Sequence, residues 1–415
     1  MGTDFGQVLR RIRGDRSLRE VASLAKCGKS YLCDLELGRR TPSAALAATL
    51  DSVLGAGGRL RALAPPSLIN PVSRRLSAPP ADLVGMYPAQ AQSDWSPEEW
   101  EQAANRHGQS ARRTAPTDLL PLLLGDFSAL TQVLKYRSHS SADRPRLISV
   151  AARLAGLIAF TLFKTGDPAS CDWSRTSRSA AAAAGDHHTL SWAYAQESVW
   201  WYFEGDMHTA LHLTTRAQLV GADQPCSGAA RAAGMEARIH AIQGRHSQAA
   251  EALSRAGTLF RHLNPAECVD SDFGFTEAKL SFHRGAVWTY LHDTSRARDA
   301  QHQALELYPS QERAERPMVQ LDHALCLAYL GHTDDATNLV VTALSPLAPS
   351  HRHHLTTRMM RVLALRPPTD IRQRNLPDTR ILSDAMKLLR YENDTASQVP
   401  SPLGLTNPGH KPSVV

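Results

Sequence analysis

The chain has 415 residues, which is enough for two or three domains, and its 46 Lys and Arg against 40 Asp and Glu give a net charge of +6. No stretch approaches the ~20 apolar residues of a membrane span. Arg10, Arg11 and Arg13 interrupt the N-terminus where a signal peptide needs an apolar segment. The six cysteines form no CxxC pair, which favours reduced thiols over disulfides or a zinc site. We therefore expect a cytoplasmic protein.

The positive charge is concentrated at the N-terminus. Residues 1–64 hold eleven Lys and Arg against six Asp and Glu, a net charge of +5, so the rest of the chain carries only +1. A small domain with an excess of positive charge is suited to binding the phosphate backbone of DNA. Because only seven of the 46 basic residues are lysines, the abundance of arginine alone is weak support for nucleic-acid binding.

Residues 17–43 predict two short helices joined by a tight turn. Apolar residues at helical spacing would bury one stripe of each helix in a shared core: Leu18, Val21, Ala22, Ala25, Leu32, Leu35 and Leu46. The second helix keeps a polar outer face, and a short helix with such a face can lie in the major groove of DNA.

The N-terminal segment resembles the phage-repressor-like (XRE) family of helix-turn-helix DNA-binding domains over about residues 4–63. Residues 20–22 (EVA) are similar to the pattern that packs the two helices together. Residues 33–40 (CDLELGRR) are similar to the family's Ser-x-x-Glu-x-Gly-x-Arg at the end of the recognition helix. The resemblance implies a five-helix lambda-repressor-like domain at residues 1–64, which binds a double-stranded DNA operator as a homodimer.

The sequence departs from the family at two places. Residues 26–28 (KCG) replace a usual Gly-Val-Ser turn, and Leu18 replaces a glutamine that often contacts phosphate. Residues 27–30 (CGKS) also look like the end of a P-loop. That motif needs an earlier glycine where Ser23 stands and a preceding strand, so nucleotide binding is not expected.

The expected DNA contacts lie on the second helix and just beyond it. Lys29 can donate to guanine and Asp34 can accept from cytosine. Arg39 and Arg40 follow the helix and suit phosphate contacts, although a solvated loop pair is the alternative. The expected DNA-binding residues are Lys29, Ser30, Tyr31, Cys33, Asp34, Arg39 and Arg40.

The rest of the chain divides by composition. Residues 65–94 hold six prolines and no helical periodicity, which predicts a linker. Residues 95–392 show a helical pattern over most of their length, and residues 393–415, rich in Pro and Ser, predict a disordered tail.

An internal repeat runs through about residues 147–348. Small residues recur at fixed offsets around each expected helix turn, which lets antiparallel helices approach closely and stack pair on pair. The long third spacing holds an inserted loop at about residues 264–273. The turns are expected, at spacings of 39, 39, 48 and 39 residues, at Gly166, Gly205, Gly244, His292 and Gly331.

The repeat resembles the tetratricopeptide (TPR) repeat, with a period of 39 residues instead of about 34. The resemblance implies an all-α fold in which a TPR-like α-solenoid follows the N-terminal domain and binds a peptide, small-molecule or protein effector in its concave groove. A non-repeating helical bundle is the alternative.

The TPR resemblance places the groove on the first helix of each pair. Cations and aromatic rings at these positions suit a ligand with a carboxylate and apolar groups, for instance a short peptide held at its C-terminus. Ordinary packing of the rings, with solvated arginines, is the alternative. The expected effector-groove residues are Arg153, Phe160, Phe163, Trp192, Tyr202, Arg231, Arg238, Lys279 and Phe282.

The sequence shows no nucleophile–base pair and no paired carboxylates, so we expect neither an enzyme nor a cofactor. Residues 351–354 (HRHH) have no nearby acid or cysteine, and we expect a solvated helix end there and not a metal site. The sequence as a whole predicts a DNA-binding transcriptional regulator with an effector-sensing domain. The alternative is a TPR interaction scaffold with a vestigial helix-turn-helix.

Overall fold

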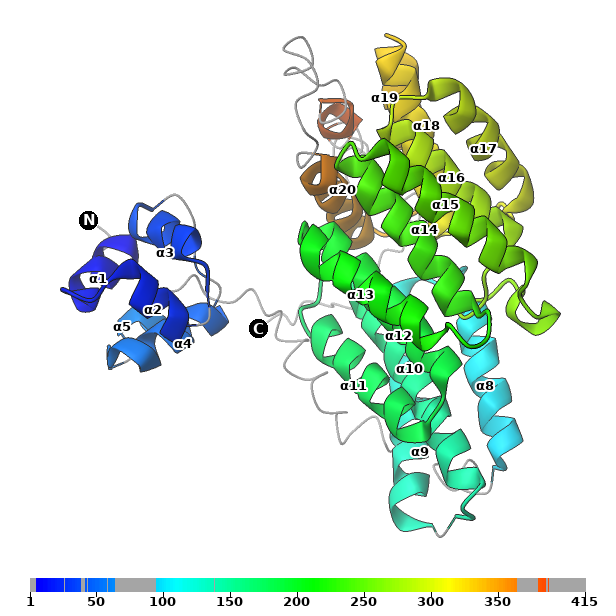
Figure 1. Cartoon of the computed structure of the whole chain (residues 1–415), viewed down its shortest axis with the longest axis horizontal. Coiled ribbons are helices and arrows are strands. Elements are labelled where there is room, and N and C mark those ends of the chain that lie inside the picture. Colours follow the sequence, from blue (N-terminus) through cyan, green and yellow to red (C-terminus); the bar gives the residue numbers. More distant parts are fainter. Residues whose placement is uncertain are drawn as a thin grey trace, which may run out of the picture. The chain divides into compact units, whose positions relative to one another are not determined.

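A computed structural model describes residues 5–25, 27–38, 42, 44–57, 59–63, 95–137, 139–363, 380–385 and 387. Within these residues the regular secondary structure is entirely helical, which confirms the all-α class (Figure 1). The chain divides into two compact units, residues 1–78 and 79–415. The expected linker and tail lie outside the described residues.

In the described part of the N-terminal unit, five short helices surround one small core. They are α1 (Phe5–Arg13), α2 (Leu18–Leu24), α3 (Lys29–Glu36), α4 (Ala44–Leu54) and α5 (Arg59–Leu63). The predicted apolar stripe is confirmed: Val21, Leu32 and Leu35 are fully buried, and Leu18 and Leu46 pack against the same core.

Local chemistry explains how α1, α2 and α3 fit together. The Ser17 side chain caps α2 by accepting a hydrogen bond from the Glu20 amide at 3.1 Å. A Cβ at Gly6 would lie 2.3 Å from the Leu35 carbonyl oxygen, so only glycine permits this approach of α1 to α3. The Arg13 guanidinium also binds the Glu36 carboxylate, with Nη2 donating to Oε2 at 3.0 Å.

The second unit is a stack of antiparallel helix pairs. Its described helices run from α8 (Pro97–Ser110) and α9 (Pro116–Tyr136) to α20 (Pro349–Leu363), and residues 380–385 beyond α20 are also helical. The first helix of each pair packs against the first helix of the next, as in a solenoid (Figure 1). The pairs are α10 (Asp143–Thr165) with α11 (Ser170–Ala184), α12 (His187–Glu204) with α13 (Met207–Val220), α14 (Ser227–Ile242) with α15 (His246–Arg261), α16 (Glu277–Tyr290) with α17 (Thr294–Leu307), and α18 (Glu315–Tyr329) with α19 (Thr333–Leu344).

The five predicted helix turns are confirmed. Each has a left-handed backbone, with φ of 77° at Gly166, 85° at Gly205, 71° at Gly244 and 89° at Gly331. His292 takes the fifth turn at φ 62°, a conformation that costs a side-chain-bearing residue about 1–2 kcal/mol.

The small residues at the repeated offsets lie where the paired helices meet. Five and twelve residues after each of the last four turns stands an alanine, whereas the first turn has Cys171 and Arg178 there. All eight alanines are buried: Ala210, Ala249, Ala297, Ala336, Ala217, Ala256, Ala304 and Ala343. Seven residues before the turn at His292, a Cβ at Gly285 would lie 2.9 Å from the Gln301 side chain. Stacking by close helix approach therefore explains the repeat.

Helix α10 is one feature that the sequence analysis missed. Its 23 residues are apolar enough for a membrane-spanning helix by length and composition, although no such stretch was expected. In the structure 78% of its most apolar window is buried inside the second unit. Arg153 and Lys164 interrupt its apolar surface. We interpret α10 as a core helix.

Two segments cover the inner surface of the solenoid, which was expected to be an open groove. Helix α20 folds back onto the C-terminal ends of α10 and α12, where Arg358 donates to the Phe163 carbonyl and Arg361 binds Glu204. The loop at residues 264–276 carries the short 3-10 helix η1 (Pro265–Glu267) and lies across the opposite halves of the inner helices. Within the described residues, the inner surface of the solenoid is therefore partly covered at both ends of its helices.

Candidate functional site

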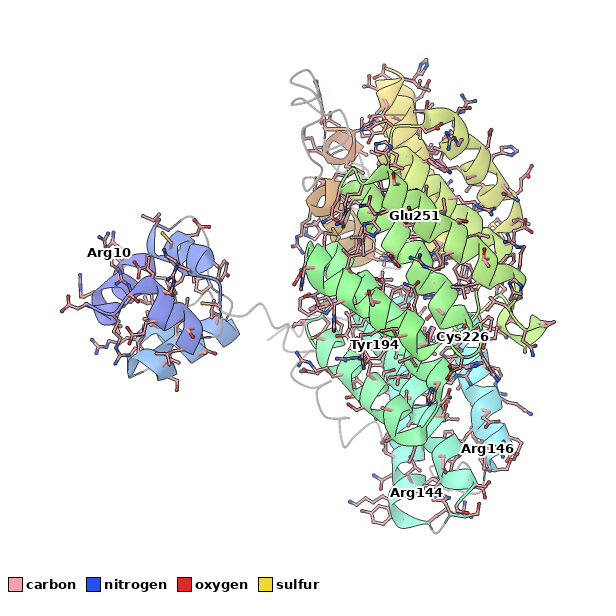
Figure 2. The ribbon with its side chains drawn as sticks, in the orientation of Figure 1. Arg10, Arg144, Arg146, Tyr194, Cys226 and Glu251 are labelled. Carbon is pink, nitrogen blue, oxygen red and sulfur yellow. The ribbon has the colours of Figure 1, made fainter. Side chains whose placement is uncertain are left out.

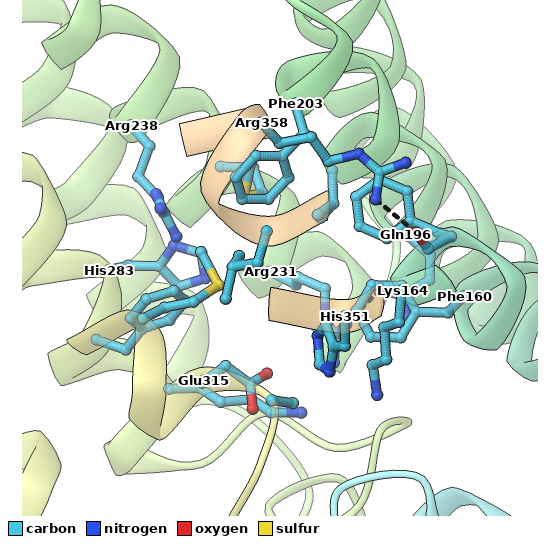
Figure 3. A pocket seen from close by; sticks show the side chains of 18 residues that line it. Phe160, Lys164, Gln196, Phe203, Arg231, Arg238, His283, Glu315, His351 and Arg358 are labelled. Carbon is cyan, nitrogen blue, oxygen red and sulfur yellow. Dashed lines mark hydrogen bonds between the residues drawn. The ribbon is translucent and has the colours of Figure 1, made fainter. Parts of the chain in front are cut away.

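The second unit contains a cavity between α10, α12, α14, α16, α18 and α20. Figure 3 shows its lining side chains around one central space. Rings and thioethers supply much of the wall: Phe160, Phe163, Phe203, Met235, Phe282 and Met318. Five cations also face it, namely Lys164, Arg231, Arg238, Lys279 and Arg358, against one carboxylate, Glu315. A mostly apolar cavity with a few polar groups is typical of a small-molecule site.

Six of the nine expected groove residues line this cavity. They come from the first helices of three helix pairs, α10, α14 and α16: Phe160, Phe163, Arg231, Arg238, Lys279 and Phe282. Tyr202 is fully buried behind them, and Arg238 lies over its ring at 5.5 Å. Arg153 and Trp192 line a second cavity, with an empty volume of about 1430 Å³.

Residues 268–275 separate the two cavities, so the expected continuous groove is wrong. The Asp272 amide donates to the Gly108 carbonyl at 2.9 Å, and the Asp272 carbonyl accepts from the Trp192 indole at 3.0 Å. The Lys279 ammonium donates to the carbonyls of Ser271 and Gly274, both at 2.8 Å. The inserted residues in the long repeat spacing therefore fold inward and occupy the middle of the groove.

Most of the cavity's cations are already bound to protein groups. Lys164 donates to the Ala111 carbonyl at 2.9 Å. Arg231 donates to the Asp272 carbonyl at 2.6 Å and to the Gln196 side chain, a bond drawn in Figure 3. Burial lowers the pKa of Lys164, and burial together with Arg231 lowers that of Lys279 well below its usual value. These groups mainly hold the backbone in place.

Arg238 is different. Its side chain is 2% exposed, and within the described residues its Nε and Nη2 atoms meet no acceptor at good hydrogen-bond geometry, although the Tyr202 and Tyr290 hydroxyls lie close to the guanidinium. Its guanidinium lies 4.6 Å from the centre of the Phe282 ring. Burial acts to lower the pKa of Arg238, but the phenols of Tyr202 and Tyr290 and the Asp322 carboxylate outweigh it, so the pKa is raised and the cation persists. A buried charged donor is costly to leave unpaired.

Glu315 offers little to neutralise these cations because it is bound elsewhere. Its Oε2 lies 2.8 Å from Nη1 of Arg112, which is itself buried and also pairs with Glu312 at 3.1 Å and Asp270 at 2.8 Å. Burial acts to raise the pKa of Glu315, but Arg112 and more distant cations lower it to about 2. Among the cavity-lining residues Glu315 is thus one carboxylate against five basic side chains, and Asp272 and Glu204 lie within 4 Å of Arg231 and Arg358.

His351 also lines the cavity, which corrects the expectation of a solvated helix end. His351 and Arg352 are buried, and His353 is exposed. The reason is the return of α20 across α10, which the local sequence pattern does not indicate. Burial, with Lys164 close by, lowers the pKa of His351 to about 3. The imidazole is therefore neutral at pH 7.

The N-terminal unit presents one side of α3 outward. Lys29 is exposed, and Cys33 and Asp34 are half-buried. Tyr31 is half-buried and packs against the core, so its ring also contributes to packing. Leu37, just after the helix, is 52% exposed and was not among the expected contacts. The exposed Arg10 on α1 adds positive charge to the surface of this unit (Figure 2).

Residues 4–64 match the family model described as a helix-turn-helix domain. The N-terminal unit is a helix-turn-helix domain. A comparison with curated proteins finds no match at all.

Some expected contacts of the helix-turn-helix domain cannot be placed. Arg39 and Arg40 lie outside the described residues, as do the side chain of Ser30 and the turn residue Lys26. The Arg13–Glu36 ion pair was not predicted from the sequence. Two opposite charges that lie 23 residues apart in the sequence do not show in the local pattern that they will pair. In the structure this ion pair connects α1 to the end of α3.

Proposed function

We propose that the protein is a sequence-specific DNA-binding transcriptional regulator whose helical-repeat domain senses an effector. The match of residues 4–64 to a helix-turn-helix domain carries this proposal. The concentration of positive charge in residues 1–64 supports it, because phosphate contacts supply much of the affinity for DNA.

In this proposal α3 is the recognition helix. Its buried residues Leu32 and Leu35 hold it on the domain core, and Lys29 and Asp34 lie on sides of the helix away from that core. Such a helix places a few side chains against base edges in the major groove. Two domains of a homodimer would read the two halves of an inverted-repeat operator.

The second domain supplies the sensor. The 39-residue repeat, its left-handed turns and its buried alanines support a TPR-like solenoid. The cavity at its centre supports effector binding, because it combines apolar walls with several basic side chains. An effector that binds one arrangement of α20 and the inner helices more tightly would change the population that binds DNA.

Selection from random DNA tests the proposal. We expect full-length protein to enrich one inverted repeat, and footprinting to show protection of both half-sites. The rival function is a protein-interaction scaffold whose helix-turn-helix domain has lost specific recognition. A selection that enriches no sequence, although the protein is folded, would favour the scaffold and contradict the proposed function.

A further inference from the structure

The shape of the cavity limits what can bind in it. Helix α20 covers one side, and residues 268–275 fill the groove on the other, held by Gly108, Trp192 and Arg231. An extended peptide running along the inner helices would have to displace this loop. The remaining space suits a compact molecule that is surrounded on most sides.

The charges of the cavity limit the ligand further. Lys164, Lys279 and Arg231 donate to backbone carbonyls, and Arg358 donates to the Phe163 carbonyl and lies 3.6 Å from the Glu204 carboxylate. Arg238 is the cavity-lining cation with two buried nitrogens that meet no acceptor at good hydrogen-bond geometry among the described residues. An anion in the cavity would supply the acceptor that those nitrogens lack.

A second polar atom near Arg238 is also unpaired. His283 is 4% exposed, lines the cavity, and its Nδ1 atom has no hydrogen-bond partner within the described part of the chain. Both side chains lie beside Phe282: the His283 ring is 5.2 Å from it, and the Arg238 guanidinium 4.6 Å. Polar atoms are thus unpaired at one end of the cavity, and Phe160 and Phe203 supply apolar surface elsewhere in it (Figure 3).

We propose that the cavity binds a compact amphipathic organic acid, whose carboxylate pairs with Arg238 and whose apolar body lies against the aromatic and methionine side chains. The regulatory consequence of binding rests on the proposed function, but the binding itself does not. We propose an organic acid and not the short peptide expected from the sequence, because the loop occupies the groove that a peptide would follow.

A matched set of probes tests the class of ligand. Decanoate, decanol and decylammonium share one apolar chain and differ in charge; 2-naphthoate and 2-naphthylmethanol form an aromatic pair. Calorimetric titration of full-length protein should show that at least one acid binds about 10-fold or more tightly than its alcohol, since a hydrogen bond to a charged group is worth that much. Decylammonium should bind more weakly than decanol.

Three variants assign the effect to the cavity. Arg238→Met should reduce the preference for acid over alcohol to about two-fold or less, because it removes the charge and keeps the apolar stem. Met318→Trp should weaken acid and alcohol alike by filling the space. Arg298→Met, on the exposed side of α17, is the control and should bind as wild type does. Circular dichroism checks that each variant is folded.

The outcomes separate this inference from the proposed function. If neither acid binds better than its alcohol, or if folded Arg238→Met keeps the preference, the ligand class is wrong even where an operator is selected. If Arg238→Met fails to fold, the Met318→Trp variant decides. If it binds the acid and the alcohol as tightly as wild type does, the ligand does not bind in this cavity. If the acid preference depends on Arg238 but no operator is enriched, the ligand class stands and the regulatory function fails.

Discussion

The guanidinium of Arg153 lies 4.0 Å from the centre of the Phe273 ring, which joins the middle of α10 to the loop between α15 and α16. The same ring meets Trp192 of α12 at 4.9 Å in an edge-on arrangement. A Cβ at Gly108 of α8 would lie 2.5 Å from it. Three helices therefore hold one loop residue, and the loop is anchored at the centre of the solenoid.

Phe273→Ala should loosen this loop without unfolding the domain. The substitution removes the cation–π and aromatic contacts with Arg153 and Trp192, and we expect the loop to lose about 1–3 kcal/mol of local stability. Hydrogen–deuterium exchange of residues 268–275 should then become about 10-fold faster or more. Val269→Ala is the control because Val269 is 42% exposed on the same loop. Equal exchange in both variants would show that Phe273 is not the anchor.

The sequence predicted those features of the fold that depend on local chemistry. Glycine tolerates a left-handed backbone, so its recurrence at Gly166, Gly205, Gly244 and Gly331 marks helix turns directly. Buried alanines recur because close helix approach requires small side chains at fixed offsets. The positions that the TPR resemblance assigned to the groove include six residues that line one cavity.

The features that the sequence did not predict depend on contacts between distant residues. The loop is held by a bond from the Asp272 amide to the Gly108 carbonyl, and α20 by a bond from Arg358 to the Phe163 carbonyl. Because a backbone carbonyl can accept from any donor, these two hydrogen bonds leave no pattern in the local sequence. The partial covering of the inner surface and the burial of His351 follow from them.

Gly6→Ala should destabilise the helix-turn-helix domain by displacing α1 from α3. The added Cβ would lie 2.3 Å from the Leu35 carbonyl oxygen and 2.8 Å from that of Glu36, and backbone atoms cannot move as a flexible side chain can. Overpacking of this kind typically costs about 1–3 kcal/mol. Hydrogen–deuterium exchange of residues 5–36 should rise, and DNA binding should weaken.

Gly125→Ala gives the matched comparison for Gly6→Ala. Gly125 also lies within a helix, α9, and a Cβ there would meet no atom within 4 Å. Alanine at such a position should leave stability unchanged or raise it by up to about 1 kcal/mol. If both variants behave alike, the close approach of α1 to α3 does not constrain the domain.

His351 should make the second domain less stable in mild acid. An unfolded chain binds a proton at this histidine near its ordinary pKa of 6.5, whereas burial lowers the folded-state pKa to about 3. Protons therefore favour the unfolded state as the pH falls below 6.5. Between its unfolded-state and folded-state pKa values, protonation of this one histidine should lower the free energy of unfolding by up to about 1.4 kcal/mol per pH unit. The loss should reach roughly 2 kcal/mol by pH 5.

His351→Leu should remove that part of the pH dependence. Urea unfolding at pH 7 and pH 5 should show a smaller loss of unfolding free energy than in wild type. His353→Leu, two residues away and exposed, is the control and should keep the wild-type slope. If His351→Leu shows the full wild-type slope, the imidazole is not held neutral in the cavity.

Arg39 and Arg40 should contribute to DNA affinity without contributing to its sequence preference. As phosphate contacts, they should weaken binding to every sequence by a similar factor when both are replaced by alanine. The slope of log affinity against log salt should fall by roughly one for each arginine lost. An unchanged salt dependence in the double variant would assign both side chains to solvent.

Lys29 and Asp34 should instead set the sequence preference. Lys29 is exposed at the start of α3, and Asp34 lies about one and a half turns further along the helix. If they bind guanine and cytosine edges, Lys29→Ala and Asp34→Ala should each cost about 1–3 kcal/mol on the selected operator and relax the preference at particular positions. Repeating the selection with each variant identifies those positions. The Arg39→Ala/Arg40→Ala protein is the comparison, since it should enrich the same sequence as wild type. Unchanged operator binding by both single variants would show that α3 is not the recognition helix.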